Sequence, residues 1–188
     1  MRRQIYQSLL ISSLLAACAP AIAGGPNISF YEVSGGSANQ LREQLNEMRP
    51  ADASGARFDS VTNYQLSYTY KFVPGSKTCR FAEFKPTIEV QIILPKWPDA
   101  DPDSRLGKRW QRYYSALYSH EMGHYDLAER AFEKLKQIGS GFETTNGCNS
   151  IGAEFKTLFD ATAQELDRSN IEYDLQTDHG KKQGAIFP

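Results

Sequence analysis

The sequence is poor in residues that bind metals or form disulfides, with only three histidines and three cysteines among its 188 residues. Its formal net charge is −1, so it lacks the surplus of positive charge that would hold a nucleic acid, and no nucleic-acid partner is expected. It has no internal repeat, and only its N-terminal segment carries a longer apolar run. Length and ordinary composition indicate one globular domain.

The first 23 residues have the pattern of an export signal. Arg2 and Arg3 precede the apolar run SLLISSLLAACA, which is too short to span a bilayer comfortably. The triplet AIA at 21–23 is an Ala-x-Ala cleavage pattern, and cleavage after Ala23 would leave a mature domain of residues 24–188. This interpretation predicts a periplasmic or secreted bacterial protein without a transmembrane helix in its mature chain.

The same segment also supports a second interpretation. LAAC at 15–18 resembles a bacterial lipoprotein box, in which Cys18 would become a lipidated N-terminus and a membrane anchor. Both interpretations place the mature protein outside the cytoplasm. Cys79 and Cys148 then remain, and two thiols in an oxidising compartment predict one disulfide. Neither cysteine has a close cysteine or histidine neighbour in sequence, which argues against a metal-binding role.

Residue periodicity predicts an α+β fold. The strands at 64–72 and 87–94 alternate apolar and polar residues and are joined by the turn PGSK, which indicates an antiparallel pair with one solvated face. We expect a small antiparallel sheet packed on a long helix and on a second, C-terminal helix. A further strand is expected at 28–33, and helices are expected at 38–48, 105–138 and 149–168. The tail beyond the last helix shows no clear period.

HEMGH at 120–124 carries two of the three histidines. Their spacing places His120 and His124 one turn apart on the same face of the long helix, where both imidazoles can bind one metal ion. That face is the apolar stripe of the helix, and two buried imidazoles are costly unless they are satisfied. The pattern predicts one zinc ion per chain, and the alternative is a pair of core histidines.

Glu121 follows His120 too closely to be a third ligand with good geometry. It can instead hold the water bound to zinc, whose pKa zinc lowers towards about 7. The predicted role of Glu121 is therefore general base, and afterwards proton donor to the leaving amine. Gly123 would let another backbone approach the helix.

The third protein ligand must come from outside this turn of helix. The only other histidine is His179, in YDLQTDHG, and it is the favoured third ligand. The alternatives are carboxylates of the last predicted helix, since zinc proteases also use a downstream carboxylate in this way. Those candidates are Glu154, Asp160 and Glu165.

Several motifs together resemble one known family. They are FYEVSG at 30–35, the two cysteines, HEMGH at 120–124, YDLQTDHG at 173–180 and GAIFP at 184–188. The chain is similar to a bacterial family of secreted proteins regarded as zinc-dependent proteases and defined as a domain of unknown function. The resemblance covers nearly all of the mature chain. It implies a zincin-like minimal protease site in an exported protein, and it implies no particular substrate.

The C-terminal motif also has a physical interpretation. A metal-bound imidazole usually donates its other N–H group to a carboxylate or carbonyl, and Asp174 or Asp178 can provide that acceptor. Tyr173 can donate a hydrogen bond to the oxyanion as a substrate carbonyl becomes tetrahedral, or it can serve in packing. Both roles remain open for Tyr173.

These features favour a zinc metallopeptidase of the cell envelope or the exterior, acting on a peptide or protein substrate. The strand at 87–94 is the expected edge along which a substrate would align. A zinc amidase acting on cell-wall peptides would share the site. A non-catalytic, metal-stabilised envelope protein is the third alternative, although a structural zinc site does not need Glu121 and usually has four protein ligands.

Overall fold

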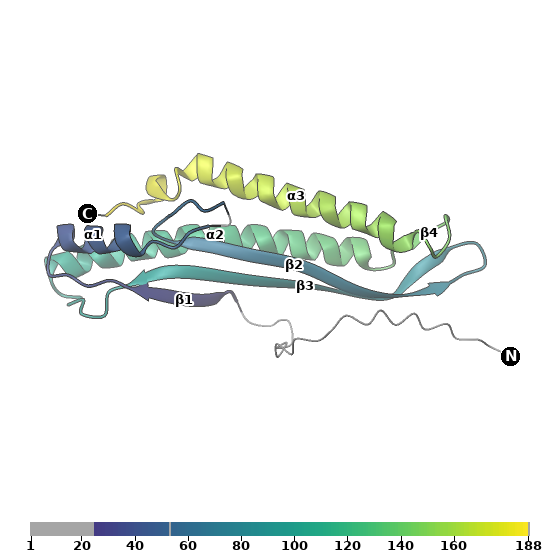
Figure 1. The fold of residues 1–188 in the computed structure, drawn as a ribbon, viewed down its shortest axis with the longest axis horizontal. Coiled ribbons are helices and arrows are strands. Elements are labelled where there is room, and N and C mark those ends of the chain that lie inside the picture. The colour runs from purple at the N-terminus through teal and green to yellow at the C-terminus, as the bar shows by residue number, and fades with distance from the viewer. Residues whose placement is uncertain (1–24, 53, 188) are drawn as a thin grey trace.

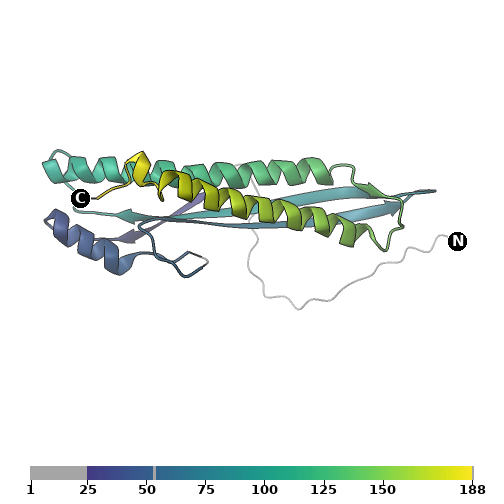
Figure 2. The same ribbon diagram turned by 90° about the horizontal axis from the view of Figure 1, so that it is seen from above.

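The computed structural model describes residues 25–52 and 54–187. The predicted signal peptide and the alternative lipidation site at Cys18 therefore lie outside the described residues. Within these residues the protein is an α+β fold with one long sheet and three α-helices (Figures 1 and 2). No helix in this part of the chain is long and apolar enough to cross a membrane.

The sheet is built around a long hairpin of β2 (Val61–Pro74) and β3 (Cys79–Lys96), which pair antiparallel as predicted. The predicted α+β fold is confirmed, but the strand β1 (Asn27–Glu32) pairs with the other side of β3 in parallel, so the sheet is mixed where an antiparallel sheet was expected. The periodicity of a strand indicates which face is buried but not the direction of its neighbour. A two-residue strand, β4 (Glu143–Thr144), pairs antiparallel with the start of β3.

The helices α1 (Ala38–Met48) and α2 (Arg105–Gly139) begin at serine caps. The side chain of Ser37 accepts a hydrogen bond from the N–H of Gln40, and the side chain of Ser104 accepts one from the N–H of Gly107. These caps satisfy backbone donors that have no partner inside the helix. Figures 1 and 2 show α2 running lengthwise along the hairpin, with α3 beside it.

The last helix, α3 (Ile151–Thr177), extends nine residues beyond its predicted end at 168. The prediction failed because the usual pattern is absent from the added turns. There the buried and half-buried positions are mostly polar, among them Asn170 and Asp174, whereas the apolar Ile171 and Leu175 are exposed. A short 3₁₀ helix, η1 (Lys181–Gln183), follows before the C-terminal segment.

Apolar packing confirms most of the predicted faces. Ile92 and Leu94 of β3 are fully buried and pack with α1 and α2 in one core cluster. At the other end of the hairpin, the ring of Tyr68 contacts Phe155 of α3, with ring centroids 4.9 Å apart. The predicted disulfide, Cys79–Cys148, joins the start of β3 to the segment before α3 beside this aromatic cluster.

A charged cluster around Asp59 fixes the entry to β2. Arg42 donates two hydrogen bonds to its carboxylate, Arg49 lies 2.9 Å away, and the hydroxyl of Tyr113 donates to the same group. The hydroxyl of Tyr31 donates to the backbone oxygen of Asp59 at 2.7 Å. Burial alone raises the pKa of Asp59, but these hydrogen bonds and charges hold it below its ordinary value. The cluster links β1, α1 and α2 to the segment before β2.

Replacing Asp59 with Asn should lower the free energy of unfolding at neutral pH by about 2–4 kcal/mol, because it removes the anion from a mostly buried cationic cluster. The pKa of Asp59 is lower in the folded than in the unfolded protein. Its contribution to the free energy of unfolding is therefore complete above pH 3.8 and is lost as pH falls through the pKa of the folded state. Urea denaturation at several pH values measures both effects. Asp160→Asn, which removes an exposed pair with Lys156, should leave stability nearly unchanged. If Asp59→Asn lowered the free energy of unfolding at neutral pH no more than this control does, the stabilising role of the Asp59 cluster would be contradicted.

Candidate metal centre and cleft

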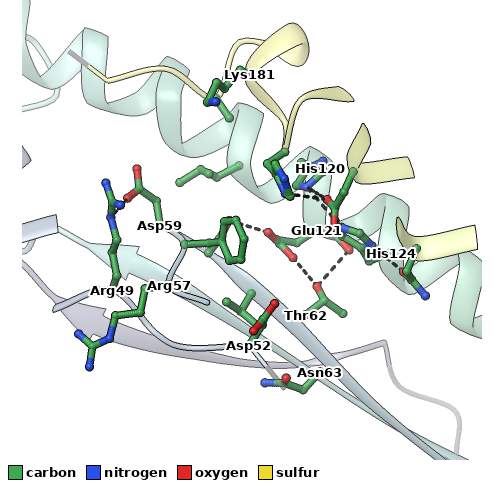
Figure 3. Close-up of a pocket in the computed structure, with 18 of the residues that line it drawn as sticks. Arg49, Asp52, Arg57, Asp59, Thr62, Asn63, His120, Glu121, His124 and Lys181 are labelled. Carbon is green, nitrogen blue, oxygen red and sulfur yellow. Dashed lines mark hydrogen bonds and ion pairs between the residues drawn. The ribbon is translucent and has the colours of Figure 1, made fainter. Parts of the chain in front are cut away.

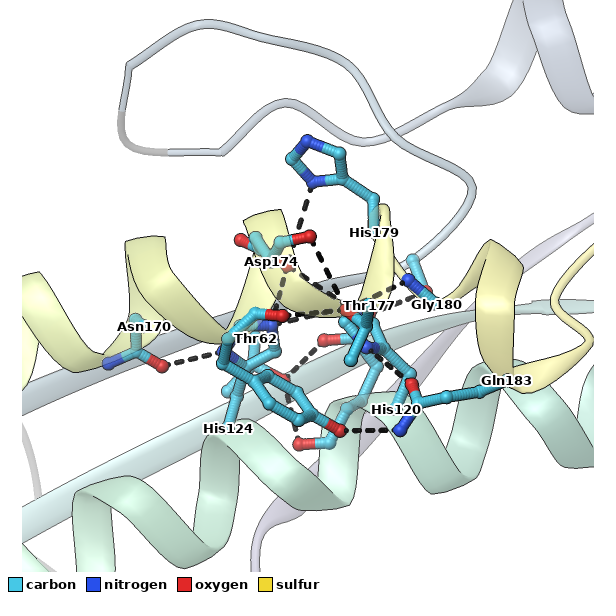
Figure 4. A network of polar contacts seen from close by, with 12 residues as sticks. Thr62, His120, His124, Asn170, Asp174, Thr177, His179, Gly180 and Gln183 are labelled. Atoms are coloured by element: carbon cyan, nitrogen blue, oxygen red, sulfur yellow. Dashed lines mark hydrogen bonds and ion pairs between the residues drawn. The ribbon is translucent and has the colours of Figure 1, made fainter.

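The two histidines of HEMGH lie one turn apart on α2 and are buried, as the sequence predicted. Each ring has one nitrogen engaged by a side-chain amide (Figure 4). Nδ1 of His124 lies 2.6 Å from the amide oxygen of Asn170, and Nδ1 of His120 lies 3.0 Å from that of Gln183. In a neutral imidazole this arrangement places the proton on Nδ1 and leaves Nε2 as an electron-pair donor.

Both amides are themselves held in orientation. The amide nitrogen of Asn170 donates to the backbone oxygen of Leu166 at 2.9 Å, and that of Gln183 donates to the hydroxyl of Tyr173 at 3.0 Å. The amide oxygens must therefore face the histidines. Neither Asn170 nor Gln183 was identified from the sequence. Asn170 lies four residues before Asp174, so its position on the site-facing side of α3 follows only once the helix is known to extend to 177.

The free nitrogens converge on one oxygen of Asp174. The Nε2 atoms of His120 and His124 are 3.3 Å apart, and they lie 3.2 and 3.1 Å from Oδ1 of Asp174. A tetrahedral zinc ion with bonds of about 2.0–2.1 Å separates its ligand atoms by about 3.3 Å. The three atoms thus have the spacing of three corners of a zinc site. They are the one group of this kind among the described residues.

Electrostatics at this point favour a cation. Three electron-pair donors converge in a site where both histidines are buried, and such groups are unfavourable together unless a proton or a metal ion lies between them. Burial alone raises the pKa of Asp174, but hydrogen bonding and charge from His120 and His124, when these rings are protonated, hold it far below its ordinary value. The carboxylate is therefore available as an anionic ligand.

His179 lies beside this group and not within it. Its Nδ1 is 3.5 Å from Oδ1 of Asp174, and its ring stacks on Phe58 across the cleft, with centroids 4.8 Å apart. The side chain is 43% exposed. Asp178 and His179 both have a left-handed backbone, with φ of 51° and 50°, which ends α3 and turns the chain back over the site. In this arrangement Asp174 takes the position that the sequence assigned to His179.

The other predicted candidates lie elsewhere. The three alternative carboxylates are exposed or half-exposed on α3, and each accepts a hydrogen bond away from the site. The pairs are Glu154 with Asn146, Asp160 with Lys156, and Glu165 with Lys134. Asp178 accepts a hydrogen bond from Lys181, so of the two aspartates proposed to orient a histidine only Asp174 contacts the pair.

Glu121 is buried on the side of α2 that faces β2. Its two carboxylate oxygens accept hydrogen bonds from the hydroxyls of Ser60 and Thr62, each at 2.6 Å. These hydroxyls satisfy a carboxylate that would otherwise be costly to bury, and they fix its orientation. Each oxygen keeps a further electron pair that can accept a proton. Ser60 and Thr62 carried no signal in the sequence, because their role depends on β2 lying beside α2.

Tyr173 packs against the histidine pair from the other side. Its ring stacks on His120 and contacts His124 edge-on, with centroids 5.1 and 5.0 Å away. The hydroxyl lies against Gly123, where a Cβ atom would overlap it. Gly123 thus admits a tyrosine ring and not, as expected, another backbone. Tyr173 is not among the residues that line the cleft, so its position fits the packing role better than a contact to a substrate carbonyl.

The histidine pair, Asp174 and Glu121 open into a cleft of about 840 Å³ between β2 and α3 (Figure 3). Its floor includes residues 60–64 at the start of β2. The strand β3, which contains residues 87–94, lies between β1 and β2 in the sheet. The expectation that residues 87–94 form the edge beside the metal helix was therefore wrong, and β2 occupies that position.

The metal-free protein should show a pKa for His124 above 6.5. Burial acts to lower it, but hydrogen bonds to Asp174 and Asn170 and the charge of Glu121 outweigh burial. The stabilising contribution of protonated His124 is thus complete below pH 6.5 and lost as pH rises through the raised value. Histidine titration by NMR should show a lower pKa for His124 in Asp174→Asn and no change in the control Asp178→Asn. If His124 had the same pKa in wild type and Asp174→Asn, Asp174 would not be a cause of the raised pKa.

Comparison with known proteins gives one match. A family model described as "Bacterial protein of unknown function (DUF922)" matches residues 28–180, which include the two cysteines of the disulfide, the whole of α2 and the site residues up to Gly180. No curated protein and no solved structure matches significantly. The match spans most of the chain, and the protein therefore belongs to this bacterial family of unknown function.

Proposed function

We propose that this protein is a zinc-dependent peptidase in which His120, His124 and Asp174 bind one zinc ion. The observation that supports this most strongly is the spacing of 3.1–3.3 Å among three converging donor atoms. The group opens into a cleft and has three protein ligands, which suits a catalytic site, whereas a structural zinc usually has four. The earlier prediction of His179 as third ligand is replaced in this proposal by Asp174.

In the proposed reaction, the zinc ion and the side chains around it have separate roles. Bound zinc supplies Lewis-acid chemistry, polarising a carbonyl and lowering the pKa of a water molecule. Glu121 accepts the proton of the attacking water and passes it to the leaving amine. Ser60 and Thr62 hold its carboxylate in one orientation during this transfer. Asn170 and Gln183 hold both histidines with Nε2 towards the metal.

The strand β2 offers a route for aligning the substrate. Among the described strands it pairs only with β3, so its other edge is free at the end of the sheet. Residues 60–64 at its start line the cleft beside Glu121. An extended peptide can add to such an edge through backbone hydrogen bonds, which places its carbonyls in a regular row along the cleft.

We also propose that the protein acts in the periplasm or outside the cell. The Cys79–Cys148 disulfide supports an oxidising compartment, because such bonds seldom persist in the cytoplasm. The apolar start of the sequence agrees with export. Whether the chain is cleaved after Ala23 or lipidated at Cys18 does not alter the proposed chemistry.

Zinc content separates the two candidate third ligands. Wild-type protein carrying the disulfide should bind one zinc ion, and Asp174→Ala should lose it, because one of the three proposed protein ligands is removed. His179→Ala and the control Asp178→Ala should keep it. Asn170→Ala should bind zinc about 10–100-fold more weakly, since His124 loses the group that orients it. Mass spectrometry for stoichiometry and a competing chelator for affinity give these values.

Other zinc contents would show which part of the proposed site is wrong. Zinc retained in Asp174→Ala and lost in His179→Ala would restore the three-histidine site. Absence of zinc from folded wild-type protein would leave a pair of core histidines and overturn the proposal.

Replacing Glu121 with Gln tests catalysis separately from binding. The variant should keep its zinc, because Glu121 is not a ligand, and hydrolysis of a broad panel of peptides should fall by about 10²–10⁴-fold. Glu129→Gln is a matched control, since Glu129 lies on the exposed side of the same helix and accepts only from Tyr125. Peptide cleavage followed by mass spectrometry measures the rates.

The panel should include amide bonds of cell-wall peptides. Hydrolysis of these alone would favour the amidase alternative, which uses the same residues. Identical behaviour of wild type and Glu121→Gln across the whole panel would reject the enzyme and favour a metal-stabilised, non-catalytic envelope protein.

A further inference from the structure

We propose that the cleft binds extended peptides bearing large apolar side chains on either side of the metal centre, and that Ile171 and Ile186 are the residues that select them. This inference rests on the proposed function and names its substrate class. It starts from three side chains. Ile171, Leu175 and Ile186 are 61, 71 and 63% exposed, more than any other large apolar side chain among the described residues.

These exposed side chains are not scattered over the surface. Ile171 and Ile186 both line the cleft, and Leu175 follows Ile171 by one turn on the same side of α3. Single exposed apolar residues are common, but a group gathered around a cleft marks a binding surface. A partner that covers these side chains removes their apolar area from water, which favours association.

The two isoleucines lie at opposite ends of the histidine pair. Ile171 directly follows Asn170, which binds His124, and Ile186 lies three residues after Gln183, which binds His120. Phe187, next to Ile186, packs on Trp110 near the start of α2 and so carries this segment away from His124. One apolar side chain of the protein therefore stands on each side of the metal centre.

The charged side chains near the ends of the cleft give less support for a charged substrate, because they already have partners in the protein. Asp59 and Lys181 each have a partner of opposite charge, and Asp167 and Arg57 each have a hydrogen-bond partner, before any substrate binds. These contacts join Asp59 to Arg42 and Arg49, Asp167 to the hydroxyl of Tyr64, Lys181 to Asp178, and Arg57 to the backbone oxygen of Glu47. The isoleucines are the groups that a substrate would newly cover.

The free edge of β2 explains how one peptide could reach both. A peptide paired with an edge strand is extended, and its alternate side chains point to the same face about 7 Å apart. Residues on either side of the bond that faces Glu121 can then contact Ile171 at one end and Ile186 at the other. Specificity would come from side-chain contacts, and alignment would come from the backbone of β2.

The test combines a binding measurement with a cleavage measurement. Zinc-loaded Glu121→Gln is used to select binders from a displayed library of random decapeptides, and wild-type protein digests the same library. We expect enrichment of large aliphatic or aromatic residues at two positions in the selected peptides. Ile171→Ser and Ile186→Ser, each added to the Glu121→Gln protein, should raise the dissociation constant for the selected peptides roughly tenfold. Leu158→Ser, which alters an exposed leucine of α3 that does not line the cleft, is the matched control.

Each outcome decides for or against the inference. Apolar enrichment and selective weakening by the two cleft variants support it, even if wild-type protein cleaves nothing, in which case the peptidase proposal fails alone. Cleavage without apolar preference overturns the inference and leaves the peptidase intact. Failure to select any peptide, or equal weakening by Leu158→Ser, also overturns it.

Discussion

The structure depends on the convergence of His120, His124 and Asp174 on one point. Three electron-pair donors at that spacing are unfavourable unless a cation joins them, so their neighbours must hold them together. Asn170 and Gln183 do so by fixing the imidazoles, and the continuation of α3 beyond 168 places both Asn170 and Asp174 opposite α2. The polar residues that hide the last turns of α3 from a periodicity analysis are therefore among those that form the site.

The rest of the fold keeps α2 aligned with β2. Ser60 and Thr62 join the start of β2 to Glu121 in the middle of the helix. Asp59, next to Ser60, ties the same segment to α1 and to the first half of α2. At the far end, the disulfide and its aromatic cluster join the hairpin to α3. The hairpin is thus fixed to the helices at both of its ends, which holds the residues that line the cleft in place. A reaction that depends on the orientation of its substrate requires such rigidity.

Much of this could be predicted from the sequence. The spacing of His120 and His124 predicted that both imidazoles share one buried face of α2, the alternation predicted the hairpin, and the cysteine count predicted the disulfide. His179 was predicted as the third ligand because it is the one remaining histidine. Asp174 was not among the alternative ligands, because nothing local indicates that α3 extends to it. The parallel pairing of β1 and the contacts of Ser60 and Thr62 join segments distant in sequence, and periodicity carries no information about such contacts.

Membership in a family of unknown function leaves the chemistry to be decided by the site itself. The most direct test is X-ray absorption at the zinc edge on purified wild-type protein. The account predicts two imidazole nitrogens and one carboxylate oxygen at about 2.0–2.2 Å, with a fourth position taken by a ligand from solvent. Three imidazoles around the metal would contradict it, and so would failure of the folded protein to take up zinc.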